Sequence, residues 1–476
     1  MNTYINKMAE KFQMNDPARE NRFKNTKSVL LWLESKRKTS SLSVKTIPFE
    51  MLDQWRFDKE TYNLIHESGK YFNIGGIRVS TNFGFIKSWD QPIIYQPEVG
   101  LLGILTRKFK GVQHFLMQAK AEPGNPNIVQ FAPTVQATES NYTQVHKGRA
   151  PLYLEYFFNH INSKILVDRL QTGQGARFFK KKNRNMIVEI NEDIKSHEYF
   201  CWLTLWQIKE LLAVDNVVNV EARSVLACMP IEGISYFSFN KPINFKTDNS
   251  GPFVLNRDLF GSIPKTGDVH MSMDMIIDWI SRMKKIYTLD TKRIPLNKTS
   301  RWKRTDFKIA HESRRFFSII AVSVNVGSRE VAYWAQPLLT SDSYGIAGFI
   351  IKKINNIFHF LVQAKVEAGN FDVIELAPTI QCSSPKDMAQ QKEKSPFLDF
   401  FINAGPDQVK YSTIQSEEGG RFYCLQNRYM IIEVDETELA EVPENYMWIT
   451  PVQMMELVKY GYCNIYARSL LAYVFI

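Results

Sequence analysis

A strand-like segment at residues 114–122, HFLMQAKAE, carries four side chains of the kinds that bind ligands or exchange protons. Successive side chains of a β-strand point to opposite faces, so the four polar residues of this segment share one face and Phe115, Met117, Ala119 and Ala121 share the other. The apolar face suits a hydrophobic core. The other face is a row of hydrogen-bonding and ionisable groups, namely His114, Gln118, Lys120 and Glu122. The alternative is an ordinary solvated face with a weak Lys–Glu surface pair.

The same pattern recurs 245 positions later, in HFLVQAKVE at residues 359–367. The repeated polar row consists of His359, Gln363, Lys365 and Glu367. If these faces were only in contact with solvent, there would be no physical reason for the same four residue types to occur at matching positions in both copies. We therefore favour a ligand-lining role for both rows.

Two arginines and an asparagine form a second repeated set, which could recognise an anion. The set is Arg177, Asn183 and Arg184 in the first copy, and Arg421, Asn427 and Arg428 in the second. A guanidinium group can bind phosphate through two parallel hydrogen bonds, so these positions are candidates for phosphate binding. The alternative is a structural ion pair with a nearby carboxylate such as Glu189 or Glu433.

Tryptophan and glutamine side chains recur as well, and they are candidates for lining a pocket. A W-x-Q-P motif places Trp89 with Gln91 and, later, Trp334 with Gln336. The remaining paired glutamines are Gln136 and Gln171, matched by Gln381 and Gln415. Their amides could read a sugar or a base, or they could satisfy buried backbone groups instead.

All of these pairs belong to one long internal repeat. The offset stays between 244 and 247 positions, from Ile47 and its partner Ile294 to Ser224 and its partner Ser469. Self-similarity of this length indicates a duplicated domain. The sequence therefore predicts two tandem domains, residues 1–240 (with an N-terminal arm) and residues 241–476, joined near residues 235–265.

Each copy contains the same succession of expected elements. An amphipathic segment opens it, at 29–36 and at 275–284, and short β-rich runs with a hairpin follow. The hairpins are expected to turn at 109–111 and at 355–356. A strand, at 186–190 and at 430–434, and a helix-like stretch, at 203–212 and at 449–458, complete each copy. Strand runs mixed with a few helices indicate an α+β fold.

Composition excludes several classes of protein. The chain has 476 residues, 44% of them hydrophobic, which predicts a globular protein of two or three domains. No apolar run approaches a membrane span, and the net charge of +10 comes without a recognisable nucleic-acid-binding module. The polar N-terminus and five scattered cysteines favour a cytoplasmic location with reduced thiols. No Rossmann, P-loop, zincin or serine-hydrolase motif occurs, so we expect no metal and no cofactor.

The repeated motifs, taken together, resemble those of the NDP-hexose 2,3-dehydratases. They are W-x-Q-P, H-F-L-x-Q-A-K-x-E-x-G-N, A-P-T-[VI]-Q and R-F-[FY]-x-x-x-N-R, each present twice, with single segments at 137–148, 200–205 and 415–422. The likeness runs from about residue 28 to the C-terminus. It implies two Nudix-like domains in each subunit, a homodimer, and two nucleotide-sugar pockets of which one is catalytic. A Nudix box is absent from both copies, which fits the loss of metal-dependent hydrolysis.

The resemblance also implies a reaction. These enzymes remove the C2 hydroxyl of dTDP-4-keto-6-deoxyglucose, giving a 3,4-diketo-2,6-dideoxy sugar that a downstream 3-ketoreductase uses. On this reading Glu122 is the base, Lys120 stabilises the enolate and His114 is the acid. Tyr142, which has no counterpart in the second copy, is a rival acid or base.

Two other functions remain open. One is a metal-dependent nucleotide-sugar hydrolase, and the other is a non-catalytic nucleotide-sugar binding protein. Between the two pockets, the segments around Tyr142 and residues 151–157, with the basic run at 180–184, favour the first copy as the catalytic one.

Overall fold

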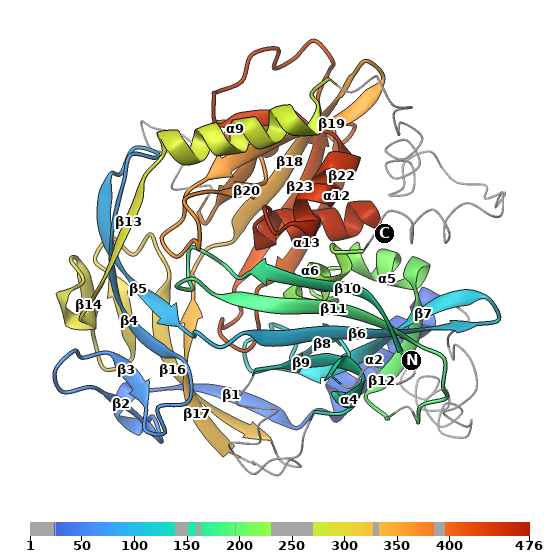
Figure 1. Cartoon of the computed structure of the whole chain (residues 1–476). Coiled ribbons are helices and arrows are strands. Elements are labelled where there is room, and N and C mark those ends of the chain that lie inside the picture. The colour runs from blue at the N-terminus through green and yellow to red at the C-terminus, as the bar shows by residue number, and fades with distance from the viewer. Residues whose placement is uncertain are drawn as a thin grey trace.

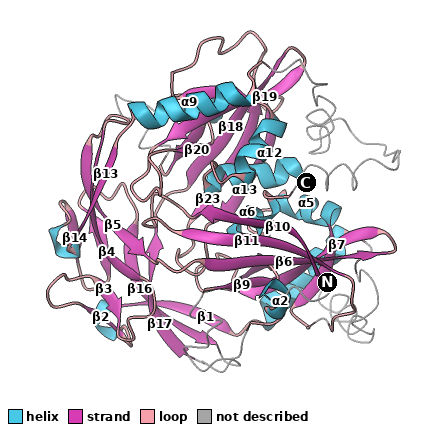
Figure 2. Cartoon of the chain, viewed as in Figure 1, coloured by secondary structure: helices cyan, strands magenta, loops and turns pink. Residues whose placement is uncertain are grey.

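Four β-sheets and a small number of helices make up the computed structural model of the chain (Figure 1). The structure describes residues 23, 25–138, 151–158, 163–195, 197–229, 270–326, 333–384 and 396–476. Two sheets have seven strands and two have five. Figure 2 shows strands making up most of the ordered structure, with helices along the sheets and at their junction. The protein is therefore a mixed α/β protein with two similar halves.

The first seven-stranded sheet belongs to the first half. Its central order is β10 (Ser163–Thr172), β11 (Lys182–Ile190), β6 (Gly100–Phe109), β7 (Val112–Ala121) and β12 (Phe200–Thr204). Two short strands complete it, with β8 (Val129–Ala132) beside β7 and β9 (Val135–Ala137) beside β6. Strands β11 and β6 run parallel and the other neighbours run antiparallel, so the sheet is mixed.

The second seven-stranded sheet repeats this order with the elements of the second half. Its strands are β22 (Val409–Ser416), β23 (Gln426–Glu433), β18 (Gly345–Ile354), β19 (Ile357–Lys365) and β24 (Tyr446–Ile449), with β20 (Glu375–Ala377) and β21 (Ile380–Cys382) at its side. The parallel pair is again in the same place, between β18 and β23. The hairpins expected at 109–111 and 355–356 are confirmed, as β6–β7 and β18–β19.

Each five-stranded antiparallel sheet takes one strand from the other half of the chain. The first consists of β13 (Leu289–Ile294), β4 (Asn73–Thr81), β3 (Leu64–His66), β2 (Trp55–Phe57) and β5 (Ser88–Tyr95). The second consists of β1 (Leu42–Ile47), β16 (Ser318–Val326), β15 (Lys308–His311), β14 (Trp302–Arg304) and β17 (Tyr333–Thr340). Strand β13 thus joins the first half and β1 joins the second, so the halves are interlocked.

Helices mark matching places in the two halves. They are α2 (Thr26–Thr39) and α9 (Met273–Ile286), α4 (Glu155–Phe158) and α11 (Leu398–Ile402), α5 (Leu205–Leu212) and α12 (Pro451–Lys459), and α6 (Val220–Leu226) and α13 (Ile465–Phe475). Single 3₁₀ turns occur at Phe49–Met51 and Leu296–Lys298. The helices expected at 29–36 and 275–284 are confirmed. Helices α6 and α13 pack against each other at the centre of the molecule (Figure 1).

The largest hydrophobic core spans both halves. Phe115 and Met117 of β7 lie in the same cluster of buried side chains as Phe360 and Val362 of β19. This confirms the predicted core face of both strands. Within the described part of the chain, no helix is long and apolar enough to cross a membrane.

Candidate active sites

Two polar clusters lie where the halves meet, and each is built from both halves. The turn that follows β7 contacts the loop between β22 and β23, where the Gly124 amide donates to the Gly419 carbonyl over 2.8 Å. The mirrored contact runs from the Gly369 amide to the Gly175 carbonyl over 2.7 Å. A Cβ atom on Gly124 would lie 1.7 Å from the Phe422 carbonyl oxygen, so this close approach requires glycine.

The first site surrounds Glu122. We define it as Lys120, Glu122, Gln136 and Glu221 of the first half with Glu418 and Arg421 of the second. The Lys120 ammonium lies 4.0 Å from Glu122 Oε1 and donates to the Gln136 carbonyl over 3.3 Å. Gln136 Nε2 donates to Glu122 Oε1 over 2.9 Å, and Asn219 Nδ2 donates to Gln136 Oε1 over 3.1 Å. Glu122 is only 5% exposed, and its buried Oε2 has no hydrogen-bond partner among the residues that the structure describes.

Two further carboxylates in the first site were not predicted from the sequence. Glu221, on α6, is 5% exposed, and within the described part of the chain neither of its buried oxygens has a hydrogen-bond partner in another residue. Burial, followed by the charges of Glu122 and Glu418, raises the pKa of Glu221 well above its usual range. Burial also raises the pKa of Glu418, against the opposing charges of Arg421 and Lys181.

The sequence did contain a signal for these two residues. Glu221 aligns with Tyr466 in the repeat, and Glu418 aligns with Gln174. A difference between the copies at an ionisable position is therefore the signal that marks these two residues.

The second site has the same hydrogen-bonded frame. We define it as Lys365, Glu367, Gln381 and Tyr466 of the second half with Gln174 and Arg177 of the first. Gln381 Nε2 donates to Glu367 Oε1 over 2.7 Å, and Asn464 Nδ2 donates to Gln381 Oε1 over 2.8 Å. Burial raises the pKa of Glu367 and lowers that of Lys365. The frame is therefore duplicated while two of its charged neighbours are not.

The arginines are exchanged between the halves, contrary to the predicted grouping. Arg177 has Tyr466 and Glu367 among its nearest charged or polar neighbours, whereas Arg421 has Glu418 and Glu122. Arg177 of the first copy therefore belongs to the second site, and Arg421 of the second copy belongs to the first site. The reason is that the loop carrying each arginine crosses to the other half. Each guanidinium also stacks on a phenylalanine, at 4.2 Å for Arg177 and 4.0 Å for Arg421.

An aromatic-walled cavity adjoins the second site. It measures about 630 Å³ and is lined by residues that include Trp89, Gln91, Arg177, Trp302, His311 and Phe317. Trp89 Nε1 donates to Gln91 Oε1 over 2.8 Å, and Gln91 Nε2 donates to the Ala176 carbonyl over 2.9 Å. Trp334, Gln336 and the Gly420 carbonyl repeat these bonds at 2.9 and 3.0 Å. The W-x-Q-P motif therefore anchors the arginine-bearing loop and also contributes to the cavity wall.

Two predicted binding glutamines are bonded to the backbone of the other half. Gln171 and Gln415 are each 1% exposed and donate to the carbonyls of Val458 and Leu212, near the ends of α12 and α5. These bonds satisfy buried backbone groups, which was the alternative explanation. Gln171 also lines a small cavity with Glu221 and Glu418, so its role in substrate binding stays a prediction.

Arg184 and Arg428 lie outside the two sites. Arg184 forms a two-bond ion pair with Asp168 at 2.8 and 2.7 Å, on the neighbouring strand rather than with Glu189. Arg428 is exposed and donates to Ser412 Oγ over 3.3 Å. Of the asparagines that precede them, Asn183 lines a small cavity with Glu221 and Glu418, and Asn427 donates to Glu417.

His114 lies too far from Glu122 to act on the same sugar ring. Eight residues of extended chain separate them, a distance of roughly 26 Å. His114 Nδ1 instead lies 2.9 Å from the Val112 carbonyl, and burial lowers the pKa of the imidazole. His359 makes the matching contact with the Ile357 carbonyl at 2.8 Å, and burial lowers its pKa to about 4. The period of two in a strand predicts which residues share a face, but residues on one face can still lie far apart along the strand. His114 and Glu122 share a face and do not belong to one site.

The other predicted residues are placed as follows. Gln118 lies two positions before Lys120 on β7 and is half-buried. Gln363 lies two positions before Lys365 on β19 and is 8% exposed. Tyr142 lies outside the described residues. In the described ranges no group of three or more His, Cys, Asp or Glu side chains is placed to hold a metal ion.

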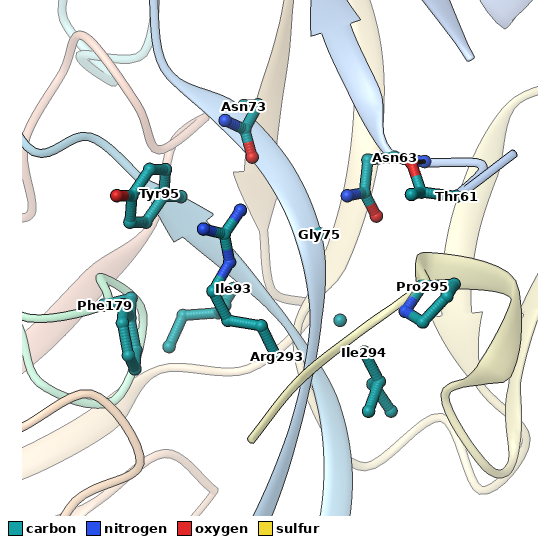
Figure 3. Close-up of a pocket in the computed structure, with 11 residues that line it drawn as sticks. Thr61, Asn63, Asn73, Gly75, Ile93, Tyr95, Phe179, Arg293, Ile294 and Pro295 are labelled. Carbon is teal, nitrogen blue, oxygen red and sulfur yellow. Dashed lines mark hydrogen bonds between the residues drawn. The ribbon is translucent and has the colours of Figure 1, made fainter. Parts of the chain in front are cut away.

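A separate hollow of about 260 Å³ lies on the first five-stranded sheet (Figure 3). Asn63, Asn73, Tyr95 and Arg293 line it, with the Arg293 guanidinium 4.1 Å from the centre of the Tyr95 ring. None of its lining residues lines the cavity beside Trp89. In the second half Ile320, a buried side chain, stands where the first half has Gly75. This hollow is therefore not one of the duplicated sites.

Comparison with known proteins gives consistent matches over nearly the whole chain. The sequence model of the NDP-hexose 2,3-dehydratase family matches residues 26–229 and 273–474. Three relatives are each described as a dTDP-4-dehydro-6-deoxy-alpha-D-glucopyranose 2,3-dehydratase. That of Saccharopolyspora spinosa is 43% identical over 93% of this chain and 89% of its own length. That of Amycolatopsis orientalis is 41% identical over 94% of this chain and 89% of its own length. That of Streptomyces violaceoruber is 38% identical over 95% of this chain and 98% of its own length.

Proposed function

Because the chain belongs to the NDP-hexose 2,3-dehydratase family, we propose that it is a dTDP-4-keto-6-deoxyglucose 2,3-dehydratase. The reaction eliminates the C2 hydroxyl and gives the 3,4-diketo-2,6-dideoxy sugar. The observation that carries the proposal, beyond the sequence matches, is the buried carboxylate of Glu122 with the half-buried Lys120 ammonium 4.0 Å away. One oxygen of that carboxylate accepts a hydrogen bond from Gln136, and the other has no partner in the described ranges.

The chemistry needs a base next to a carbonyl. The C4 ketone of the substrate acidifies the proton on C3, and Glu122 is the base that removes it. Lys120 supplies positive charge for the oxyanion that develops at C4. A positioned base typically contributes about 10²–10⁴-fold to the rate. These groups belong to the protein, so the proposal invokes no metal and no cofactor.

The first site is the catalytic one in this proposal. It holds Glu122 together with Glu221 and Glu418, whereas Tyr466 and Gln174 occupy the last two positions in the second site. Arg421 and Arg177 are the groups we assign to the diphosphate of the nucleotide in the first and second sites. The second site then binds a nucleotide sugar without converting it.

Three wider features extend the proposal. The mixed sheet with flanking helices in each half supports a Nudix-like fold for both halves. The family resemblance supports a cytoplasmic homodimer. The reactive diketo product calls for a 3-ketoreductase that acts next.

One assay separates the dehydratase from the other candidate functions. The purified chain is incubated with dTDP-4-keto-6-deoxyglucose, with and without EDTA, and the sugar is followed by NMR. We expect loss of the C2 hydroxyl in both samples. Release of sugar phosphate only with magnesium would identify a hydrolase, and binding without turnover would identify a nucleotide-sugar binding protein.

A further inference from the structure

The duplication supplies an internal comparison for the catalytic chemistry. Both sites keep the same frame of lysine, glutamate, glutamine and asparagine, with closely similar hydrogen-bond lengths. A residue that serves only this frame has no reason to differ between them. The first site has the carboxylates Glu221 and Glu418 where the second has Tyr466 and Gln174, and the second has Glu375 beside Glu367 where the first copy has Gln130. Only Glu221 and Glu418 are carboxylates added around Glu122.

Glu221 is placed as a reactive group rather than a structural one. It is 5% exposed, and among the described residues both of its buried side-chain oxygens lack a hydrogen-bond partner outside Glu221 itself, whose own backbone amide is the one group that favours the ionised form by hydrogen bonding. Buried polar groups in folded proteins almost always have partners, so two unpartnered oxygens on one carboxylate point to a partner that arrives with the substrate. Glu221 also lines a cavity of about 10 Å³, together with Glu418, Lys181 and Asn183, which has room for about one water molecule or hydroxyl group.

The charges around Glu221 favour its neutral form. Glu122 and Glu418 face it with negative charge, and Lys120 is the cation that opposes them. Burial and the two carboxylates raise the pKa of Glu221 well above its usual range. Glu122 differs, because it accepts a hydrogen bond from Gln136 and has Lys120 at 4.0 Å. Two carboxyl groups with different surroundings can serve as acid and base in one reaction.

We propose that Glu221 is the proton donor to the departing C2 hydroxyl, an assignment that rests on the proposed dehydratase function. Glu122 takes the C3 proton, and the electron pair of that bond forms the C4 enolate. When the enolate collapses, the C4 carbonyl re-forms, a C2–C3 double bond forms and the C2–O bond breaks. The hydroxyl takes the proton of Glu221 and leaves as water. The C3 enol then tautomerises to the ketone, as C2 gains a proton and the C3 hydroxyl loses one. Exchange with solvent removes the proton from Glu122 and returns one to Glu221, so both carboxyl groups regain their starting states.

The test separates proton removal from elimination. The variants Glu221→Gln and Glu122→Gln are incubated with dTDP-4-keto-6-deoxyglucose in D₂O, and NMR follows both C3 deuteration and C2 deoxygenation. We expect Glu221→Gln to lose deoxygenation by about 10²-fold or more and to retain C3 deuteration. Glu122→Gln should lose both. Glu456→Gln, at a partly exposed glutamate on α12 outside both sites, is the matched control and should behave as the wild type.

Thermal melting and dTDP binding show whether Glu221→Gln is folded. Since glutamine resembles the neutral acid in shape, the variant should melt cooperatively at a Tm no lower than that of the wild type and should bind dTDP with wild-type affinity. Deoxygenation at the wild-type rate would overturn the assignment, and so would loss of C3 deuteration in a folded variant that binds dTDP. Absence of deoxygenation by the wild-type chain would instead overturn the proposed function, and this assignment with it.

Discussion

Among single residues, Glu122 is the one on which the proposed chemistry depends most. Glu122→Gln keeps the size of the side chain but removes the basic oxygen. We expect kcat to fall by at least about 10²-fold, because a positioned base contributes 10²–10⁴-fold, while dTDP affinity stays within about twofold. Steady-state kinetics and calorimetric titration with dTDP measure the two quantities. A variant with wild-type kcat would remove Glu122 from the role of base.

The titration of Glu221 leads to a further prediction, which concerns the dependence of stability on pH. Its pKa is raised in the folded state by burial and by Glu122 and Glu418, with Lys120 opposing. The folded state therefore binds more protons than the unfolded state once the pH exceeds the unfolded value of about 4.3, and stability falls as pH rises. Between the unfolded and folded pKa values the loss is about 1.4 kcal/mol per pH unit for this group.

Glu221→Gln has no such proton to lose. The quantity to compare is the Tm of the variant minus the Tm of the wild type. We expect this difference to be larger, in favour of the variant, at pH 8 than at pH 5. Calorimetric melts of both proteins across this range make the comparison. Equal differences at the two pH values would show that Glu221 is not held neutral in the folded protein.

Sequence reasoning located some of these residues and not others, for a physical reason. Lys120, Glu122 and Gln136 could be found because they lie on strands whose alternation marks one polar face. Gln171 and Arg184 recur just as faithfully, yet one caps a helix end of the other half and the other pairs with Asp168. Repetition shows that a residue is retained, and only the packing shows whether its partner is a substrate or the protein.

Among the elements, the loop between β22 and β23 shapes the first site. A Cβ atom on Gly420 would lie 3.9 Å from both Glu122 Oε1 and Glu418 Oε1, which is ordinary van der Waals contact. The second site has Ala176 at this position. The backbone therefore accommodates a side chain here, while the glycine leaves space between two carboxylates.

Gly420→Ala fills that space with one methyl group. We expect kcat/KM to fall by roughly tenfold or more, the usual effect of one carbon in a fitted pocket, while the Tm changes little. Kinetics at several substrate concentrations and a thermal melt test both parts. Wild-type kcat/KM would show that the substrate does not occupy the space beside Gly420.

Local elements could be predicted well, and their long-range pairing could not. The opening helices, the hairpin turns and the closing strands lie where hydrophobic periodicity and turn residues place them. The exchange of β1 and β13 has no local signal, because it depends on which of two similar edges each strand pairs with. The exchanged arginines escaped prediction for the same reason.

In the whole molecule, buried arginines connect the two halves at the central helices. Arg223 on α6 donates to the Ser416 carbonyl over 2.6 Å, and Arg468 on α13 donates to Ser224 Oγ over 3.1 Å. Each arginine is 1% exposed, so its loss would leave buried groups of the other half without partners. With the shared core and the exchanged strands, these bonds make folding of either half dependent on the other.

Separating the halves tests that dependence. Residues 1–240 and residues 241–476, expressed individually, should each aggregate or remain unfolded, because β1 or β13 loses its partner sheet and half of the largest core is exposed. Expressed together, the fragments should associate and recover dehydratase activity, since each site draws residues from both. Circular dichroism and size-exclusion chromatography of the separate and joint products, with the NMR assay, give the readout. A first fragment that folds and dehydrates alone would contradict the composite sites, because it lacks Glu418 and Arg421.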